Sequence, residues 1–317
     1  MSDFVKQEGS INAFNGTDAW VILSPIEQSI MQKIEAVGTP LKDWDIQINY
    51  GIKTGCNEAF IISTEKRDEI LANCQSEDER RKTEELIRPI LRGRDIKRYG
   101  YNWAGLYLIA TFPSRHYDIE EYPAVKAYLL SYEDKRLREA GLEIIANEYL
   151  AEFCQQKLAQ VGKRVEIDGQ PVEINKKQEK SRKKTNNKWF ETQDSISYWD
   201  LFFLPHICWK AVGRNLAFAL VERGTFLTAP ASFISAGEYN ETILAYLASK
   251  VGTFYIYTYS DTTGAGDIML NIQSLIKFPI PVKKEVFCNM SDAEINNKIY
   301  EAYGLTNIEI SYIEEQV

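Results

Sequence analysis

The sequence contains few of the patterns by which metal and redox sites are recognised. Its five cysteines are scattered and no two form a Cys-x-x-Cys pair, so neither a zinc site nor a disulfide framework is indicated. Only two histidines occur, His116 and His206, and they are far apart, without the spacing of metal ligands. We therefore expect no metal bound by this chain and a structural role for each histidine.

Targeting and membrane-spanning segments are also missing. The first ten residues, MSDFVKQEGS, lack the basic start and apolar run of a signal peptide. No stretch approaches the roughly 20 apolar residues that a membrane-spanning helix requires. We expect a cytoplasmic protein with free thiols and no membrane partner.

Signatures of common catalytic sites are absent as well, including the nucleophile elbow. Glu133-Asp134-Lys135 has the acid-x-Lys form of some nuclease sites, but it falls within an expected surface helix and no Pro-Asp strand precedes it. Residues 261–267, DTTGAGD, lack the closing Lys-Ser/Thr of a phosphate loop, and turn geometry explains their glycines better. The sequence therefore predicts that this chain is not an enzyme by itself.

What the sequence does contain is an acidic body with two basic segments. Its 317 residues are 44% hydrophobic and 26% charged, as in folded globular proteins, and carry a net charge of -8. Residues 88–98 hold five cations against Asp95, and residues 176–188 hold seven against Glu179. Such runs are often solvated surface, and the alternative is a surface for phosphate groups.

Hydrophobic spacing and capping residues predict helices and strands that do not alternate regularly. Ser24, Pro25 and Glu27 have the pattern of a helix start with a capping box. Further helices are expected at residues 64–73, from 76 toward Pro89, and at 122–140, 142–161, 241–259, 292–303 and 307–315. Strands are expected at residues 45–50, 59–62 and 106–111, and repeatedly between 199 and 235.

This order of elements favours an α+β fold with a mixed or antiparallel sheet, flanking helices and a helical C-terminal tail. We expect a lead-in segment at residues 1–19, a main domain at 20–285 and the tail at 286–317. Within the domain, residues 162–188 are expected to form a basic loop or hairpin insert.

Seven segments in a fixed order connect the sequence to a known family. They are WVILSPIEQSIMQKIEAVGTPLKDWDIQINYGIKTGCNEAFIIS from Trp20, then LIRPILRGRDIKRYG, IEEYPAVKAYLL, NKWFETQDSISYWDLFFLPHICWKAVGRNLAFAL, ILAYLASKVGTFYIYTYS, NIQSLIKFPIP and IYEAYGLTNIEI. Together they resemble the target-recognition region of type IIG restriction-modification enzymes of the Eco57I-like group, which carry a TaqI-like specificity domain. The resemblance spans about residues 20 to 315, and residues 163–186 fit the family pattern least well.

The resemblance implies a function for the chain as part of a larger enzyme. In that family the methyltransferase portion binds S-adenosylmethionine and methylates adenine at N6, using an Asn-Pro-Pro-Tyr/Phe motif and a Gly-rich cofactor loop. Neither feature occurs here. The chain is then the C-terminal specificity part, a fragment or a separate subunit. Its implied partners are double-stranded DNA and the methyltransferase/nuclease portion. S-adenosylmethionine and Mg²⁺ are expected for the parent enzyme and not for this chain.

The basic residues after Pro89 are the first candidates for contacts to DNA. A tight loop there could present its cations to phosphates, which fix the register of a protein on DNA. We expect folding to gather these cations on one concave wall. The residues are Arg92, Arg94, Lys97 and Arg98.

Three further segments supply candidates. The loop at residues 51–57 offers polar side chains that could read base edges, although a plain turn with positive φ at Gly51 and Gly55 explains it equally well. A turn at Gly213 is flanked by two cations, and the basic insert carries four more. The residues are Lys53, Thr54, Asn57, Lys210, Arg214, Arg182, Lys183, Lys184 and Lys188.

Two alternatives stay open beside DNA recognition. The chain could be a scaffold subunit of a restriction-modification or phage-defence complex, docking a partner through its acidic C-terminal helices. It could also be an independent nuclease using Glu133 and Lys135. Several aromatic residues are expected to be buried rather than to stack on bases. They are Tyr246, Phe254, Tyr255 and Tyr257. For Trp189, burial and a position along the sugar-phosphate surface both stay open.

Overall fold

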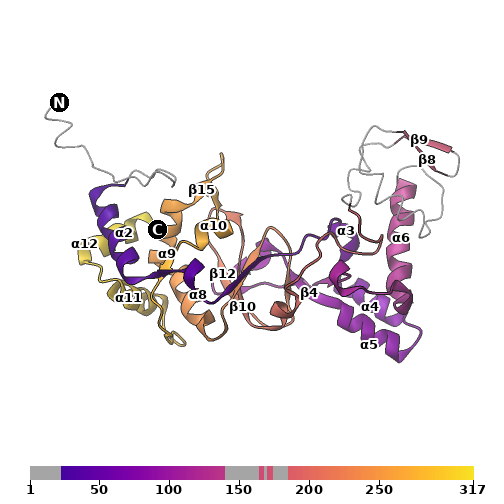
Figure 1. The fold of residues 1–317 in the computed structure, drawn as a ribbon, viewed down its shortest axis with the longest axis horizontal. Coiled ribbons are helices and arrows are strands. Elements are labelled where there is room, and N and C mark those ends of the chain that lie inside the picture. Colours follow the sequence, from indigo (N-terminus) through magenta and orange to yellow (C-terminus); the bar gives the residue numbers. More distant parts are fainter. Residues whose placement is uncertain (1–22, 140–163, 168–169, 174–184) are drawn as a thin grey trace.

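The molecule is elongated, with helices at both ends and strands between them (Figure 1). The computed structural model describes residues 23–139, 164–167, 170–173 and 185–317. Among these residues, no helix has the length and apolar character needed to cross a bilayer. The expected helix at residues 142–161 lies outside the described ranges.

Helices enclose the two ends of the molecule. The longer ones are α2 (Pro25–Val37), α4 (Thr64–Ala72), α5 (Glu77–Leu86), α6 (Pro123–Glu139), α8 (Asn240–Ala248), α9 (Lys250–Tyr259), α11 (Asp292–Ala302) and α12 (Asn307–Gln316). The short helices are α3 (Asn57–Phe60) and α10 (Ile272–Leu275). At one end lie α2 and α8 to α12, and at the other end lie α3 to α6 (Figure 1).

Two four-stranded sheets occupy the middle. The first is antiparallel, in the order β12 (Phe218–Val221), β10 (His206–Trp209), β14 (Ser232–Ser235) and β2 (Gln47–Tyr50). The second is mixed, in the order β13 (Phe226–Leu227), β4 (Ile87–Leu91), β7 (Leu106–Ile109) and β3 (Ile61–Ser63), with β13 and β4 parallel. These sheets and their flanking helices confirm the α+β class.

Smaller ladders complete the strand set. They are β1 (Thr39–Pro40) with β17 (Pro279–Ile280), β5 (Ile96–Lys97) with β6 (Gly100–Tyr101), β8 (Arg164–Ile167) with β9 (Gln170–Glu173), and β11 (Val212–Gly213) with β16 (Ile268–Met269) and β15 (Asp261–Thr262). The hairpin of β8 and β9 lies within residues 162–188, where a loop or hairpin was expected.

The antiparallel sheet lies between two hydrophobic cores. Ile207 and Trp209 on β10 belong to the core that contains α2 and α8 to α12, whereas Cys208 between them belongs to the other core. On β14, Phe233 and Ile234 divide in the same way. Side chains alternate across a strand, so a strand covered on both faces has buried side chains at every position. All four residues of β10 and of β14 are accordingly buried.

Local capping signals place the helix starts correctly. Ser24 and Glu27 form the expected capping box of α2, with Pro25 in its first turn. Ser76 caps α5 as expected, accepting from the N–H of Glu79. The Glu79 carboxylate accepts from Gln75 N–H at 2.7 Å and from Ala124 N–H, at the start of α6, at 2.9 Å. One buried carboxylate therefore joins two helix starts.

Two expected elements differ from the structure. The strand expected at residues 59–62 begins as the helical turn α3 and becomes extended only at Ile61. The single helix expected at 241–259 is broken at Ser249, whose ψ of 166° is extended. Ser249 caps α9 by accepting from Gly252 N–H at 3.0 Å, and its hydroxyl donates to the Tyr246 carbonyl at 2.7 Å.

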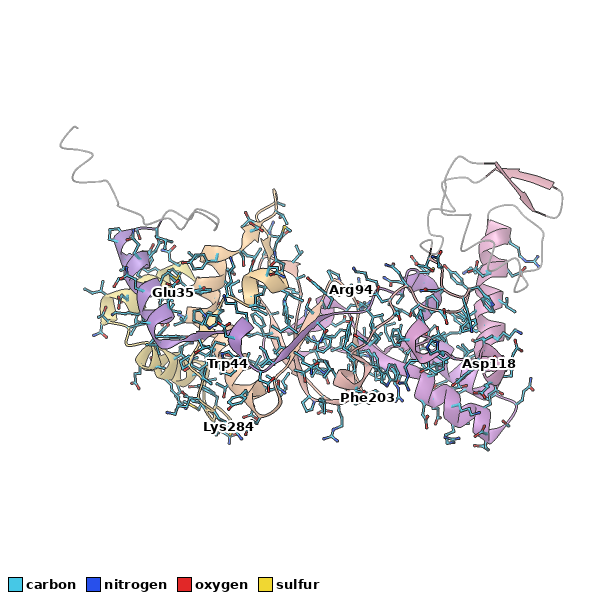
Figure 2. All side chains as sticks on the ribbon, in the orientation of Figure 1. Glu35, Trp44, Arg94, Asp118, Phe203 and Lys284 are labelled. Carbon is cyan, nitrogen blue, oxygen red and sulfur yellow. The ribbon has the colours of Figure 1, made fainter. Side chains whose placement is uncertain are left out.

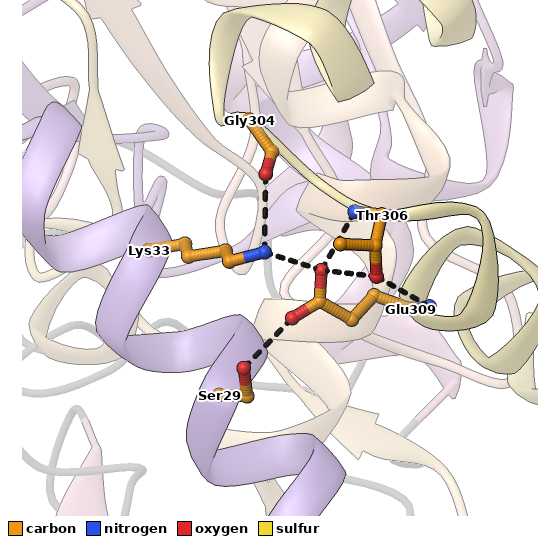
Figure 3. A network of polar contacts seen from close by, with 5 residues as sticks. All are labelled: Ser29, Lys33, Gly304, Thr306 and Glu309. Atoms are coloured by element: carbon orange, nitrogen blue, oxygen red, sulfur yellow. Dashed lines mark hydrogen bonds and ion pairs between the residues drawn. The ribbon is translucent and has the colours of Figure 1, made fainter.

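The C-terminal helices belong to the same core as the first described helix. Lys33 on α2 forms an ion pair with Glu309 on α12 at 2.6 Å and donates to the Gly304 carbonyl (Figure 3). Ser29 donates to the other carboxylate oxygen of Glu309 at 2.8 Å, and Thr306 donates to this side chain through its N–H at 2.7 Å. The two ends of the described chain are therefore joined by one polar network.

Replacing Glu309 by glutamine tests this network. Burial opposes ionisation of Glu309, but Lys33, Thr306 and Ser29 outweigh it and lower its pKa from 4.5 to about 2. This stabilisation is complete above pH 4.5 and is lost as the pH falls through about 2. In urea unfolding at pH 7, the free energy of unfolding of Glu309→Gln should be lower than that of the wild type by about 2 kcal/mol. This difference should become smaller as the pH falls toward 2.

The exposed Glu315 on the same helix offers the matched control for that experiment. Glu315→Gln should leave the free energy of unfolding within about 0.5 kcal/mol of the wild type. The proposed role of the carboxylate would be contradicted if Glu309→Gln and the wild type differed in free energy of unfolding by the same amount from pH 7 to pH 2.

Candidate functional site

The first group of candidate cations lies in and around the turn η2 (Gly93–Asp95). The buried Asp95 carboxylate accepts from the Arg92 backbone N–H at 2.9 Å and from the guanidinium nitrogens Nε and Nη2 at 3.0 and 2.8 Å. Burial opposes ionisation of Asp95, but these bonds outweigh it and lower its pKa. Arg92, predicted to contact DNA, instead has its guanidinium paired within the chain, where it holds the turn.

Arg94 and Lys97 remain exposed on this turn and the strand that follows it. The Lys97 ammonium group donates to the Arg94 backbone carbonyl at 3.2 Å, which holds the Lys97 side chain against the turn. A Cβ atom on Gly93 would lie 3.4 Å from Lys210 Cβ, so the turn packs directly against the end of β10. Folding thus brings Arg94, Lys97 and Lys210 to one place, from segments far apart in the sequence.

Arg98 and Arg214 have acidic neighbours. Arg98 forms an ion pair with Asp292 at 3.0 Å and donates to the Ala248 carbonyl at 3.1 Å. Its guanidinium group is therefore already engaged within the chain, although the residue was expected to bind a DNA phosphate. Arg214 lies 4.0 Å from Asp267 in the β15–β16 hairpin, and its side chain is 83% exposed. Arg214 therefore remains available to a ligand.

The loop at residues 51–57 is internally braced. Thr54 is buried, and its hydroxyl donates to Asn57 Oδ1 at 2.7 Å and accepts from Cys56 N–H at 3.2 Å. Thr54, predicted to read bases, is therefore a structural residue. Gly55 has the expected positive φ of 79°. Gly51 does not have a positive φ. It is required for space instead, because a Cβ atom there would lie 2.5 Å from the Thr228 carbonyl carbon.

Two exposed candidates of this loop, Lys53 and Asn57, lie beside residues 193–194, which were not among the candidates for contacts to DNA. Gln193 N–H donates to the Thr54 carbonyl at 3.0 Å, and Asp194 accepts from Lys53 N–H at 2.9 Å. Half-buried Gln193 thus joins the same loop surface. No local pattern marks Gln193, because its neighbours come from a segment about 140 residues earlier.

Of the basic insert, the structure describes the β8–β9 hairpin and residues 185–188. Lys188 is exposed, with its ammonium group 5.6 Å from the ring centre of Phe190. Arg182, Lys183 and Lys184 lie outside the described residues, so their role stays a prediction.

The face that contains Arg94 also presents other projecting elements. Arg94 lies at the narrow middle of the molecule (Figure 2). The β8–β9 hairpin and the β15–β16 hairpin project on that same side, and α3, which follows the loop with Lys53, lies there too (Figure 1). Arg94 and helix α3 therefore lie on the same side of the molecule in this view.

The other motifs have structural roles. His206 is buried between Phe202 and Phe233, its Nδ1 lies 2.9 Å from the Leu204 carbonyl, and burial lowers its pKa. Residues 261–267 form strand β15 and the turn that leads to β16, and the turn contains both glycines, as expected. His116 is exposed in the left-handed region, at a φ of 52°. The aromatic residues expected in the interior are buried or packed against a core, Tyr257 being half-buried.

Groups of metal-ligating side chains are not found in the part of the chain that the structure describes. Within the ranges named above, no three His, Cys, Asp or Glu side chains are placed to hold one ion together. Glu133 of the acid-x-Lys segment lies on α6 and is 1% exposed, rather than on a surface as expected.

Comparisons with known proteins agree with the ordered segments. Two solved structures are similar: the type IIG restriction endonuclease BpuSI, at 13% identity and a TM-score of 0.49, and the type IIL restriction-modification enzyme MmeI in complex with DNA, at 12% and 0.47. Each match covers 87% of this chain but only 28% and 36% of the respective structures, so the chain spans about a third of their length. No curated protein matches. The model of the TaqI-like C-terminal specificity domain matches residues 88–280, more than half of the sequence. The chain therefore belongs to the family of TaqI-like C-terminal specificity domains.

Proposed function

We propose that this chain recognises a specific sequence in double-stranded DNA and positions an adenine-N6 methyltransferase and nuclease that lie outside it. Membership of a specificity-domain family carries the proposal. On this proposal S-adenosylmethionine and Mg²⁺ are bound by the other portions of the enzyme, on the same chain or on a separate subunit.

The arrangement of cations supports a DNA ligand despite the net charge of -8. Affinity for phosphates depends on local cations rather than on the sum over the chain. Arg94, Lys97 and Lys210 would hold the DNA backbone. Lys53 and Asn57, with Gln193 beside them, would face base edges, since amide side chains pair with adenine in the major groove.

Selection from a random duplex library tests the proposal directly. The purified chain should enrich one short motif and bind it with a submicromolar Kd. The logarithm of the binding constant should fall linearly with the logarithm of the salt concentration, because phosphate contacts release counterions. Equal, weak binding to every duplex would refute autonomous recognition of sequence.

Two other functions are less well supported. A scaffold role finds no support in the family match, which is to a specificity domain. A nuclease role would require Glu133, which is buried in α6. Incubation with supercoiled plasmid and Mg²⁺ should leave the plasmid intact, whereas nicking that is lost in Glu133→Gln would restore the nuclease hypothesis.

A further inference from the structure

A second cationic site lies away from the residues proposed to hold DNA. It is a pocket of about 270 Å³ with walls from α5, β4 and the turns η3 (Pro113–Arg115) and η6 (Trp199–Phe203). Arg88 and Arg115 line it together with Tyr117, Trp199 and Phe203. Figure 2 places Phe203 on the edge of the molecule opposite to Arg94.

Arg88 is held firmly but lacks a full set of partners. It lies on β4, opposite Leu108 of β7, and its guanidinium carbon is 5.2 Å from the ring centre of Phe203. Its Nε atom is buried and has no acceptor among the residues that the structure describes. A buried donor left in this way costs about 1–3 kcal/mol, and a bound ion is one of the ordinary reasons for it.

Arg115 approaches the same pocket from the end of η3. Its guanidinium carbon lies 5.2 Å from the ring centre of Trp199, and the side chain is exposed on its other face. Burial raises the pKa of Tyr117, and Arg115 and Arg88 both counteract this rise. Both arginines and Tyr117 line the same pocket, and both guanidinium groups act on this phenol.

Neither arginine has an ion pair among the described residues, although Glu85 counteracts the fall in the pKa of Arg88 that burial causes. Lys82, which also lines the pocket, is already paired with Asp78 at 3.1 Å and with Glu121 at 3.7 Å. Glu85 faces the pocket as well, and its ion pair is with Arg81 at 3.6 Å. Within the described part of the chain, no carboxylate oxygen lies within 4.0 Å of either pocket arginine.

We propose that this pocket binds a phosphate group, held by the guanidinium groups of Arg88 and Arg115. Guanidinium groups match phosphate oxygens with paired N–H donors, and two of them balance the charge of a phosphate. The rings of Trp199 and Phe203 keep both groups in place by cation–π contact and limit access of water. The phosphate comes either from a DNA backbone that extends around this side or from a small free phosphate.

Calorimetric titration with inorganic phosphate, at constant ionic strength set with sodium chloride, tests the site. The wild type should bind one phosphate per chain, and Arg115→Ala should bind at least about ten-fold more weakly, since one charge-assisted contact is lost. Arg88→Lys, which keeps the charge and removes the inward Nε donor, should weaken binding similarly. Arg80→Ala changes an exposed arginine of α5 whose ion pair, with Glu84, lies outside the pocket, and it should bind as the wild type does.

The outcomes separate this site from the proposed DNA surface. Phosphate binding should persist in Arg94→Ala/Lys97→Ala, whatever that variant does to DNA binding. No binding by the wild type, or equal binding by Arg115→Ala, would overturn the proposal. A short duplex then identifies the source: weaker duplex binding by Arg115→Ala assigns the phosphate to DNA, and unchanged duplex binding assigns it to a small ligand.

Discussion

Replacement of Gly252 by alanine is expected to lower the free energy of unfolding by at least about 3 kcal/mol, at the upper end of the usual cost of overpacking. Gly252 lies in the first turn of α9, just after the break at Ser249. A Cβ atom there would lie 2.2 Å from the Tyr246 carbonyl oxygen and 2.8 Å from that of Leu247. Both atoms belong to the backbone of α8, so relief requires the two helices to separate.

Chemical denaturation followed by circular dichroism measures this effect. Gly264→Ala is the control, because a Cβ atom there meets nothing within 4 Å and the backbone needs no positive φ. It should change the stability by less than about 0.5 kcal/mol. Equal stability of Gly252→Ala and the wild type would show that α8 and α9 do not meet as described.

Replacement of Arg94 and Lys97 together by alanine is expected to weaken duplex binding about thirty-fold at 0.15 M salt. Each phosphate contact contributes about 0.9 to the slope of log K against log salt, so two lost contacts also reduce that slope by about 2. Fluorescence anisotropy with the selected duplex, over a range of salt concentrations, measures both quantities. Folding should be unaffected, because both side chains are exposed.

The matched control is Lys283→Ala/Lys284→Ala. Both lysines are exposed, and Lys284 lies on the opposite edge of the molecule (Figure 2). This variant removes the same charge and should keep the wild-type slope and affinity. If both double variants lose affinity equally, the charge of the whole chain matters rather than the surface around Arg94.

Helix starts and the α+β class were predictable because their signals are local. Ser24 and Ser76 sit at cap positions and bond to residues three places on. The break at Ser249 was missed because it depends on close backbone packing, which hydrophobic spacing does not report. The residues around it, from Ile243 to Tyr255, are apolar in a pattern typical of one continuous helix.

The candidate site was predictable in composition but not in partners. Arg92 pairs with Asp95, three residues away, and this pairing could have been considered from the sequence. Arg98 pairs with Asp292, which only the tertiary fold brings close. Gln193 reaches the loop containing Lys53 for the same reason. Charge patterning thus finds a basic segment, while the fold decides which of its members remain available.

The sheet of β12, β10, β14 and β2 has a consequence for unfolding. Its strands supply side chains to both hydrophobic cores. If one core unfolds, the sheet that also covers the other core is disrupted, so neither core can unfold alone. Fluorescence changes of Trp209 and Trp199, which belong to different cores, should therefore coincide in a single cooperative transition. The end that contains α3 to α6 and the end that contains α8 to α12 would then unfold as one unit.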